Sequence, residues 1–273
     1  METQQRTYPA GVTSWVDLEQ PDLGATQAFY GGLFGWQFEV VGGGEYVIAR
    51  LDGRDAAGLG EGDGDGSAWT TYVAVDDADA TTARVAAAGG TVVEPVGVVG
   101  SAGRMAVVDD PAGARFRLWE AGHRLGAQVT NAPGSWNFSD LHGVDADTVE
   151  RFYADVFGWV VTDVGFGRMI RRPGYGDHVA ATVDPGIHER QAGVSVPDGF
   201  ADAIGWIVAR DPEESPHWHV TFTVADRDAA AADVVRLGGT VLASDDTDWT
   251  RTARVRDPQG AQLTLSQFSP PSG

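Results

Sequence analysis

Internal duplication limits the possible folds of this 273-residue chain more than any other feature of its sequence. Three phrases occur twice, in the same order. They are FY-x-x-x-FGW, which begins at Phe29 and Phe152; Gly-Gly-Thr-Val, at Gly89 and Gly238; and Asp-Pro-x-Gly, at Asp110 and Asp257. Several phrases that recur in the same order indicate a modular architecture. The sequence therefore predicts two similar halves.

Each half divides again into two units with one pattern: a strand, an aspartate, a helix, and then further strands. In the third unit Asp145 is suited to cap a helix, because its carboxylate can accept from the free amides of the first turn. Val149, Phe152, Tyr153 and Val156 follow at helical spacing and form one apolar stripe. We expect helices after Asp22, Asp77, Asp145 and Asp226, and strands at 45–51, 70–75, 104–108, 115–119 and 219–224.

Four such units resemble the vicinal oxygen chelate superfamily, which includes glyoxalase I, extradiol dioxygenases and bleomycin-resistance proteins. The two FY-x-x-x-FGW phrases and the two Asp-Pro-x-Gly turns carry the resemblance, and the FGW form most resembles a two-domain, glyoxalase-like subgroup of actinobacterial type. The resemblance implies an α+β fold of four βαβββ modules in two tandem domains, each enclosing a cavity. We place the domains at 1–125 (modules 11–60 and 68–120) and 126–273 (modules 133–190 and 217–268). Whether modules pair within or across the halves is left open.

Charge and composition exclude several classes of function. A formal charge of −20 and a pI near 4.4 repel phosphate backbones and anionic lipids, so we expect neither a nucleic-acid nor a membrane partner. The sequence contains no cysteine, which excludes thiolate chemistry, and all 19 basic residues are arginine, which excludes a lysine Schiff base. The first ten residues are polar, without the apolar stretch of a secretory signal. We expect a soluble, cytoplasmic protein that is a monomer or a homodimer.

The resemblance also implies where a metal would bind: a histidine on a module's first strand, seven residues before the capping aspartate, and a glutamate on its last strand. The matching first-strand positions are Trp15, Thr70, His219, and Phe138 by counting or Trp136 by matching tryptophans; the last-strand positions are Arg117 and Thr264. Only His219 is a ligand type, and a catalytic metal needs three or four ligands. We therefore predict no metal centre and no cofactor.

Two alternatives to this prediction stay open. The first is chelation by His217 and His219, which would share one face of a strand. The second is an error of one or two residues in the register, which would bring Glu120, Asp17 or His142 to the site.

Without a metal, the predicted cavities are lined by aromatic and hydrogen-bonding side chains. Strand alternation places several candidates on common faces. The candidate ligand-binding residues are Trp15, Asp17, Thr70, Tyr72, Arg117 and Trp119 in the first half, and Trp136, Phe138, His219, Thr221 and Thr264 in the second. Such a lining suits a flat, partly polar organic molecule. The leading hypothesis is metal-independent binding of a small aromatic or polyketide-like compound, for sequestration and resistance or for modification without a metal.

Three rival hypotheses remain. The chain could be a metal-dependent lyase or ring-cleaving dioxygenase centred on His219. It could be a cofactor-free isomerase or hydroxylase that uses His219, Asp17 or Asp140 as a catalytic base. It could also be a scaffold whose cavities are filled by tryptophan side chains. His142, two residues after Asp140, is either a base oriented by that carboxylate or an exposed loop histidine.

Overall fold

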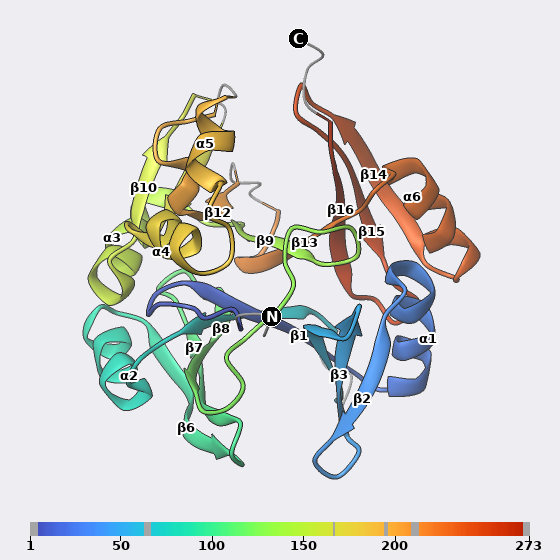
Figure 1. Ribbon diagram of the computed structural model, residues 1–273. Helices are drawn as coiled ribbons and strands as arrows, with labels where there is room; N and C mark the ends of the chain where they lie inside the picture. The colour runs from blue at the N-terminus through green and yellow to red at the C-terminus, as the bar shows by residue number, and fades with distance from the viewer. Residues whose placement is uncertain (1–4, 63–66, 166, 194–195, 209–212, 270–273) are drawn as a thin grey trace. The chain divides into compact units, whose positions relative to one another are not determined.

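The computed structural model describes residues 5–62, 67–165, 167–193, 196–208 and 213–269, and it confirms an α+β fold of four consecutive modules (Figure 1). The first module contains β1 (Thr13–Gln20), α1 (Leu23–Phe34), β2 (Gln37–Val41), β3 (Tyr46–Leu51) and β4 (Arg54–Glu61). The second contains β5 (Trp69–Ala74), α2 (Ala78–Ala87), β6 (Thr91–Val99), β7 (Gly103–Asp109) and β8 (Arg115–Ala121).

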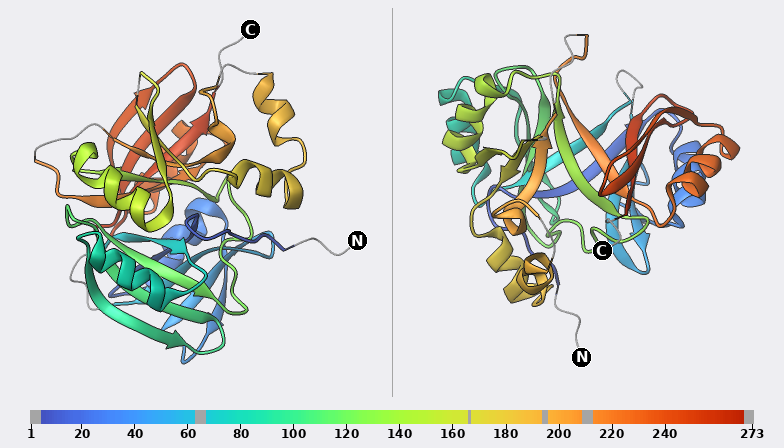
Figure 2. Two further views of the ribbon diagram at one scale, coloured as in Figure 1. Left: turned by 90° about the vertical axis from the view of Figure 1, so that its left-hand side faces the viewer. Right: turned by 90° about the horizontal axis from the view of Figure 1, so that it is seen from above.

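The second half repeats this order. The third module contains β9 (Trp136–His142), α3 (Ala146–Phe157), β10 (Val160–Asp163), β11 (Arg168–Arg171) and β12 (Ala203–Ile207). The fourth contains β13 (His217–Thr223), α6 (Arg227–Arg236), β14 (Thr240–Asp246), β15 (Thr250–Arg256) and β16 (Gln262–Phe268). Between β11 and β12 the chain inserts α4 (Tyr175–Thr182), α5 (Ile187–Ala192) and a short 3-10 helix, η1 (Phe200–Asp202), which the sequence patterns did not predict; α4 and α5 are the gold helices of Figure 2.

The predicted helix caps are confirmed at all four module helices. Asp22 accepts from the Ala25 amide at 2.8 Å, and Asp77 accepts from the Ala80 amide at 2.9 Å. Asp145 and Asp226 cap α3 and α6 in the same way. The FGW phrase lies at the C-terminal end of the helix in the first and third modules. Its glycines, Gly35 and Gly158, end α1 and α3 in the left-handed conformation, with φ of 73° and 69°, which glycine adopts without steric cost.

The strands form two eight-stranded mixed sheets, each built from one half of the sequence. Their orders are β2-β3-β4-β1-β5-β8-β7-β6 and β10-β11-β12-β9-β13-β16-β15-β14. Within each module the first strand pairs in parallel with the last, and the remaining pairs are antiparallel. The first and last strands of a module therefore lie side by side, as the predicted ligand positions require.

The chain also divides into two compact units, and each unit takes modules from both halves. Unit 1 consists of Met1–Ser14, Thr71–Gly126 and Ser139–Trp218; unit 2 consists of Trp15–Thr70, Ala127–Phe138 and His219–Gly273. Helices α2 and α3 pack together in unit 1, and α1 packs on α6 in unit 2. The sequence left the pairing of modules open, and the two levels of structure differ in this respect. Each sheet is built from the two modules of one half, whereas each pair of packed helices takes one helix from each half.

In each unit, the repeated phrases meet in one buried hydrogen-bonded group. In unit 1 the Tyr153 hydroxyl donates to Asp110 at 2.9 Å and lies 3.2 Å from the indole nitrogen of Trp218, which donates to it. In unit 2 the Tyr30 hydroxyl donates to Asp257 at 3.0 Å and accepts from Trp69 at 3.1 Å. The tyrosine of the FY phrase and the aspartate of the Asp-Pro-x-Gly turn are therefore structural partners.

None of the helices in the described ranges is long and apolar enough to cross a membrane.

Candidate functional site

In unit 2, the first-strand candidates Trp15 and Asp17 are joined through a residue that the sequence analysis did not single out. The Trp15 indole nitrogen donates to the Tyr46 hydroxyl at 3.3 Å, and that hydroxyl donates to Asp17 at 3.2 Å. Trp15 and Asp17 thus share one face of β1, in agreement with strand alternation. The Asp17 side chain is buried, with 1% exposure, so the shared hydroxyl helps to satisfy a carboxylate that is removed from water.

Gly58 explains how Tyr46 reaches this position. In the parallel register Asp17 lies opposite Gly58, and a Cβ added at Gly58 would stand 1.7 Å from the Tyr46 hydroxyl. The missing side chain therefore leaves the space that the tyrosine occupies.

We expect Gly58→Ala to displace Tyr46 and to lower the free energy of unfolding by about 1–3 kcal/mol, because Asp17 loses a donor while it remains buried. Chemical denaturation measures this loss. In a Tyr46→Ala background the same glycine substitution should cost much less, since nothing is left to displace. Gly43→Ala is the matched control: no atom lies within 4 Å of its added Cβ, and we expect a change below about 0.5 kcal/mol. Equal costs for the two glycines would contradict this role of Tyr46.

In unit 1, Tyr72, Arg117 and Trp119 form one contact group on neighbouring strands β5 and β8. Tyr72 and Arg117 are opposite in register, and the guanidinium Nη1 donates to the Tyr72 hydroxyl at 2.7 Å. The guanidinium carbon also lies 5.5 Å from the Tyr72 ring centre. The Tyr72 and Trp119 rings meet edge to face at 6.2 Å. A cation, a phenol and an indole are thus held together, and arginine is suited to clamp an anion or a carbonyl.

Two acids close to Arg117 in the sequence have described partners of their own. Glu120 accepts from the amide that opens α2 and from Arg104, at 2.8 and 3.1 Å. Asp109 accepts from Arg115, the neighbouring arginine on β8, at 2.8 Å.

In the second half, the candidates of unit 2 form a smaller group. The His219 imidazole nitrogen Nε2 lies 2.8 Å from the Thr264 hydroxyl, and Thr221 pairs with Thr264 in register. Trp136 is 2% exposed, and its indole nitrogen has no acceptor among the described residues. A buried donor without a partner costs about 1–3 kcal/mol unless something supplies an acceptor. Phe138 is half-buried, and so is Thr70, the candidate of the first half that also belongs to unit 2.

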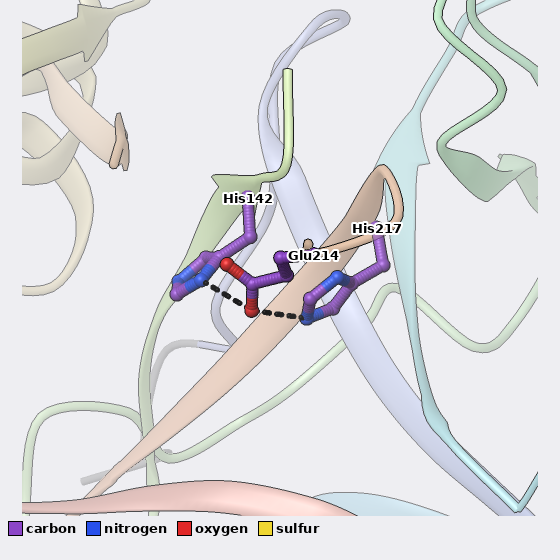
Figure 3. A group of neighbouring side chains, drawn as sticks. All are labelled: His142, Glu214 and His217. Carbon is purple, nitrogen blue, oxygen red and sulfur yellow. Dashed lines mark hydrogen bonds and ion pairs between the residues drawn. The ribbon is translucent and has the colours of Figure 1, made fainter. Parts of the chain in front are cut away.

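The remaining candidate base, Asp140, has a described partner other than His142. Its carboxylate accepts from the backbone amide of Trp206 at 3.1 Å. His142 is the last residue of β9 rather than part of an exposed loop, and its Nδ1 lies 3.3 Å from the Glu214 carboxylate (Figure 3). His217 lies on the other side of the same carboxylate, with its Nε2 at 3.8 Å. Glu214 was missed because it lies far along the chain, and local spacing carries no signal for it.

The metal centre implied by the resemblance does not fit the residues at its expected places. The parallel registers identify Gly58, Arg117 and Thr264 as equivalent last-strand positions, and none of them offers a carboxylate. Among the predicted first-strand positions, Trp15, Thr70, Phe138 or Trp136, and His219, only His219 is a ligand type, and it is hydrogen-bonded to Thr264. We therefore derive no chemistry through a metal at these strand positions.

Comparison with protein-family models gives a match in each half. The model described as "Glyoxalase/Bleomycin resistance protein/Dioxygenase superfamily" matches residues 14–118, and the model described as "Glyoxalase-like domain" matches residues 138–266. Curated relatives match almost end to end. The "Anthracycline biosynthesis protein DnrV" of Streptomyces peucetius is 36% identical and covers 96% of this chain and 94% of its own. The "Putative glyoxylase CFP32" of Mycobacterium tuberculosis is 33% identical and covers 96% and 97%.

Solved structures share the fold at low sequence identity. The Mn(II)-bound glyoxalase from Novosphingobium aromaticivorans aligns with a TM-score of 0.64 and 17% identity, over 94% of this chain and 82% of that one. The 2,3-dioxygenase LapB from Pseudomonas sp. KL28 aligns with a TM-score of 0.61 and 15% identity, over 99% and 96%.

Proposed function

The chain belongs to the glyoxalase/bleomycin resistance protein/dioxygenase superfamily, and on that premise we propose that it binds a flat, hydroxylated aromatic molecule of the anthracycline type. In this proposal, binding does not use a metal at the superfamily's strand positions. The substrate class is suggested by the two Streptomyces relatives named for anthracycline biosynthesis. The binding serves either to sequester the molecule, as in resistance, or to hold it for modification.

The contact between Arg117 and Tyr72 carries this proposal. Arg117 stands where a metal-dependent relative would need a carboxylate, and it both hydrogen-bonds to Tyr72 and lies over its ring. A guanidinium held against aromatic rings suits a ligand whose own rings carry carbonyl or phenolate oxygens. In unit 2, taken by itself, the buried indole N–H of Trp136 has no acceptor among the described residues and can donate to an oxygen of a ligand held by that unit.

The energies show why polar groups are needed. Burying about 300 Å² of apolar ligand surface at about 25 cal/mol/Å² gives about 7 kcal/mol. Association costs at least about 4 kcal/mol of this. Micromolar binding needs about 8 kcal/mol in total, so charged and hydrogen-bonding contacts must supply several kcal/mol.

Quenching of tryptophan fluorescence by an anthracycline and by a dihydroxyanthraquinone tests the proposal in buffer that contains EDTA. We expect saturable binding at micromolar concentration, and a loss of tenfold or more in affinity for Arg117→Gln, because about 1.4 kcal/mol of interaction corresponds to tenfold. Arg115→Gln is the matched control: it lies on the same strand, is exposed and pairs with Asp109. Absence of saturation, or equal affinities for the two variants, would remove the basis of the proposal.

A metal-free modification of an aromatic molecule is the second candidate, and the buried Asp17 of unit 2 favours it. A carboxylate with 1% exposure that accepts from Tyr46 has the setting of a general base. Asp17→Asn should then abolish turnover of an aromatic substrate, followed by chromatography. Unchanged turnover would leave binding alone as the function.

A further inference from the structure

We infer that His142, Glu214 and His217 in unit 1 form a binding site for one divalent transition-metal ion. Two imidazoles and one carboxylate are a ligand set that zinc and related ions use, with coordination positions left for water or a ligand. In Figure 3 the three side chains converge, with the Glu214 carboxylate between the two rings. This inference is independent of the proposed function, which uses other residues.

The three ligand atoms lie slightly farther apart than the ligands of a bound zinc ion. One nitrogen or oxygen of each residue lies within 4.8 Å of the other two, and the Glu214 oxygen is 3.3 Å from His142 Nδ1 and 3.8 Å from His217 Nε2. Two ligands bonded to zinc at about 2.0–2.1 Å in tetrahedral geometry are about 3.3 Å apart. Small side-chain rotations would therefore close the group around an ion.

The hydrogen bond of His217 leaves its other nitrogen ready to bind a metal. His217 Nδ1 lies 2.9 Å from the carbonyl oxygen of Ser215, and a carbonyl can only accept, so Nδ1 carries the proton. In the neutral ring, Nε2 then presents a lone pair toward the Glu214 carboxylate. Two lone pairs that face each other need a cation or a proton between them. A backbone carbonyl that fixes the tautomer in this way is the usual support of a metal-binding histidine.

Backbone packing holds the carboxylate beside β9. Gly143 follows His142 and has φ of +68°, and a Cβ added to it would lie 2.6 Å from backbone atoms of Glu214 and Ser215. The strand end and the 214–215 segment thus touch through a glycine that tolerates both the conformation and the close approach. The ligand-bearing segments are therefore placed by the fold and not only by the charges of the side chains.

This group is distinct from the metal position that the superfamily resemblance implies. His142 ends its strand, three residues before the capping Asp145, whereas the implied ligand lies seven residues before the cap. His217 lies two residues before the implied position at His219, and Glu214 precedes β13 instead of lying on a last strand. His219, the other histidine of the predicted His217–His219 pair, is hydrogen-bonded to Thr264.

Calorimetric titration of the metal-stripped, untagged full chain with Zn²⁺ tests the inference, and Co²⁺ substitution adds a visible absorption spectrum. We expect one ion per chain with a micromolar or lower dissociation constant. His142→Ala, Glu214→Gln and His217→Ala should each weaken it tenfold or more and change the Co²⁺ spectrum. His188→Ala is the control, because His188 also pairs with a carboxylate, that of Asp177, but has no place in the cluster.

Two outcomes would overturn the site: absence of stoichiometric uptake, or uptake that is unchanged in all three variants. Circular dichroism verifies that each variant folds, and Glu214→Gln changes the shape of the side chain least. The aromatic titration in EDTA remains a separate test, so failure of the metal site leaves the proposed ligand binding standing, and the reverse also holds.

Discussion

Trp159→Ala is expected to lower the free energy of unfolding by about 3–5 kcal/mol, the range for removing a large aromatic side chain from a core. Trp159 is 2% exposed and stacks on Tyr153, with ring centres 4.6 Å apart and planes 15° from parallel. It also meets Trp218 edge to face at 5.9 Å. Its removal opens a cavity at the point where the FY-x-x-x-FGW phrase of α3 meets the neighbouring module.

Trp159→Ala also removes a hydrogen bond of the indole nitrogen, which lowers the free energy of unfolding further. It donates to the backbone carbonyl of Gly11 at 2.5 Å and so ties the N-terminal segment to the core of unit 1. Trp159→Phe keeps one six-membered ring but loses this bond and the packing of the second ring, and we expect it to cost about 1–3 kcal/mol.

Denaturation followed by far-ultraviolet circular dichroism measures the free energy of unfolding of Trp159→Ala and Trp159→Phe. Trp249→Ala is the control, because Trp249 is half-buried and stacks only loosely on the exposed Phe268, at 6.2 Å. We expect it to cost less than about 1 kcal/mol. If Trp159→Ala cost no more than the control, the phrase would not have the structural role that we assign to it.

Much of the fold follows from local signals in the sequence. An aspartate before each expected helical stretch predicted the start of four helices, and the glycine of each FGW phrase marks where α1 and α3 end. The inserted helices α4 and α5 carry no such signal. Both begin after a glycine that makes no side-chain cap, and their short lengths leave little periodicity to detect.

The candidate site was predictable only where neighbours on one strand or on paired strands were involved. Trp15 with Asp17, and Tyr72 with Arg117, follow from alternation and from the strand order of a module. Tyr46 was missed because its position depends on a space left by Gly58. Glu214 was missed because a tertiary contact brings it to His142, and neither residue's local pattern specifies the other.

The largest effect expected of a polar substitution concerns Asp110, the aspartate of the first Asp-Pro-x-Gly turn. Its carboxylate accepts from the amides of Ala112 and Ala114, each at 2.9 Å, and from the Tyr153 hydroxyl at 2.9 Å. Asp110→Ala leaves these donors without their acceptor in the interior, and we expect a loss of about 3 kcal/mol. Tyr153→Phe removes one of the three bonds and should cost about 1.5–3 kcal/mol.

A double-mutant cycle on these two substitutions tests whether they act through one bond. Because Tyr153 and Asp110 are in direct contact, the double variant should cost less than the sum of the single variants, by about 1–2 kcal/mol. Strict additivity would contradict the contact. Asp109→Ala serves as the control: Asp109 is adjacent in sequence and pairs with Arg115 at the surface, where ion pairs contribute up to about 1 kcal/mol.

The pH dependence of stability gives an independent test of the same carboxylate. Burial raises the pKa of Asp110 above its usual 3.8, although the hydrogen bonds from Ala114, Tyr153 and Ala112 oppose the rise. The folded state therefore holds this proton to a higher pH than the unfolded state does, so the contribution of Asp110 to stability falls as pH increases from 3.8 through the raised pKa. Asp110→Asn cannot titrate and lacks this step. The free energy of unfolding of Asp110→Asn should thus fall furthest below that of the unmodified chain at low pH, and this difference should shrink as pH rises. Unfolding curves measured from acid to neutral pH test this. If the difference in free energy of unfolding grew with pH, the fold would stabilise the charged form of the Asp110 carboxylate, and burial would not be the dominant influence on its pKa.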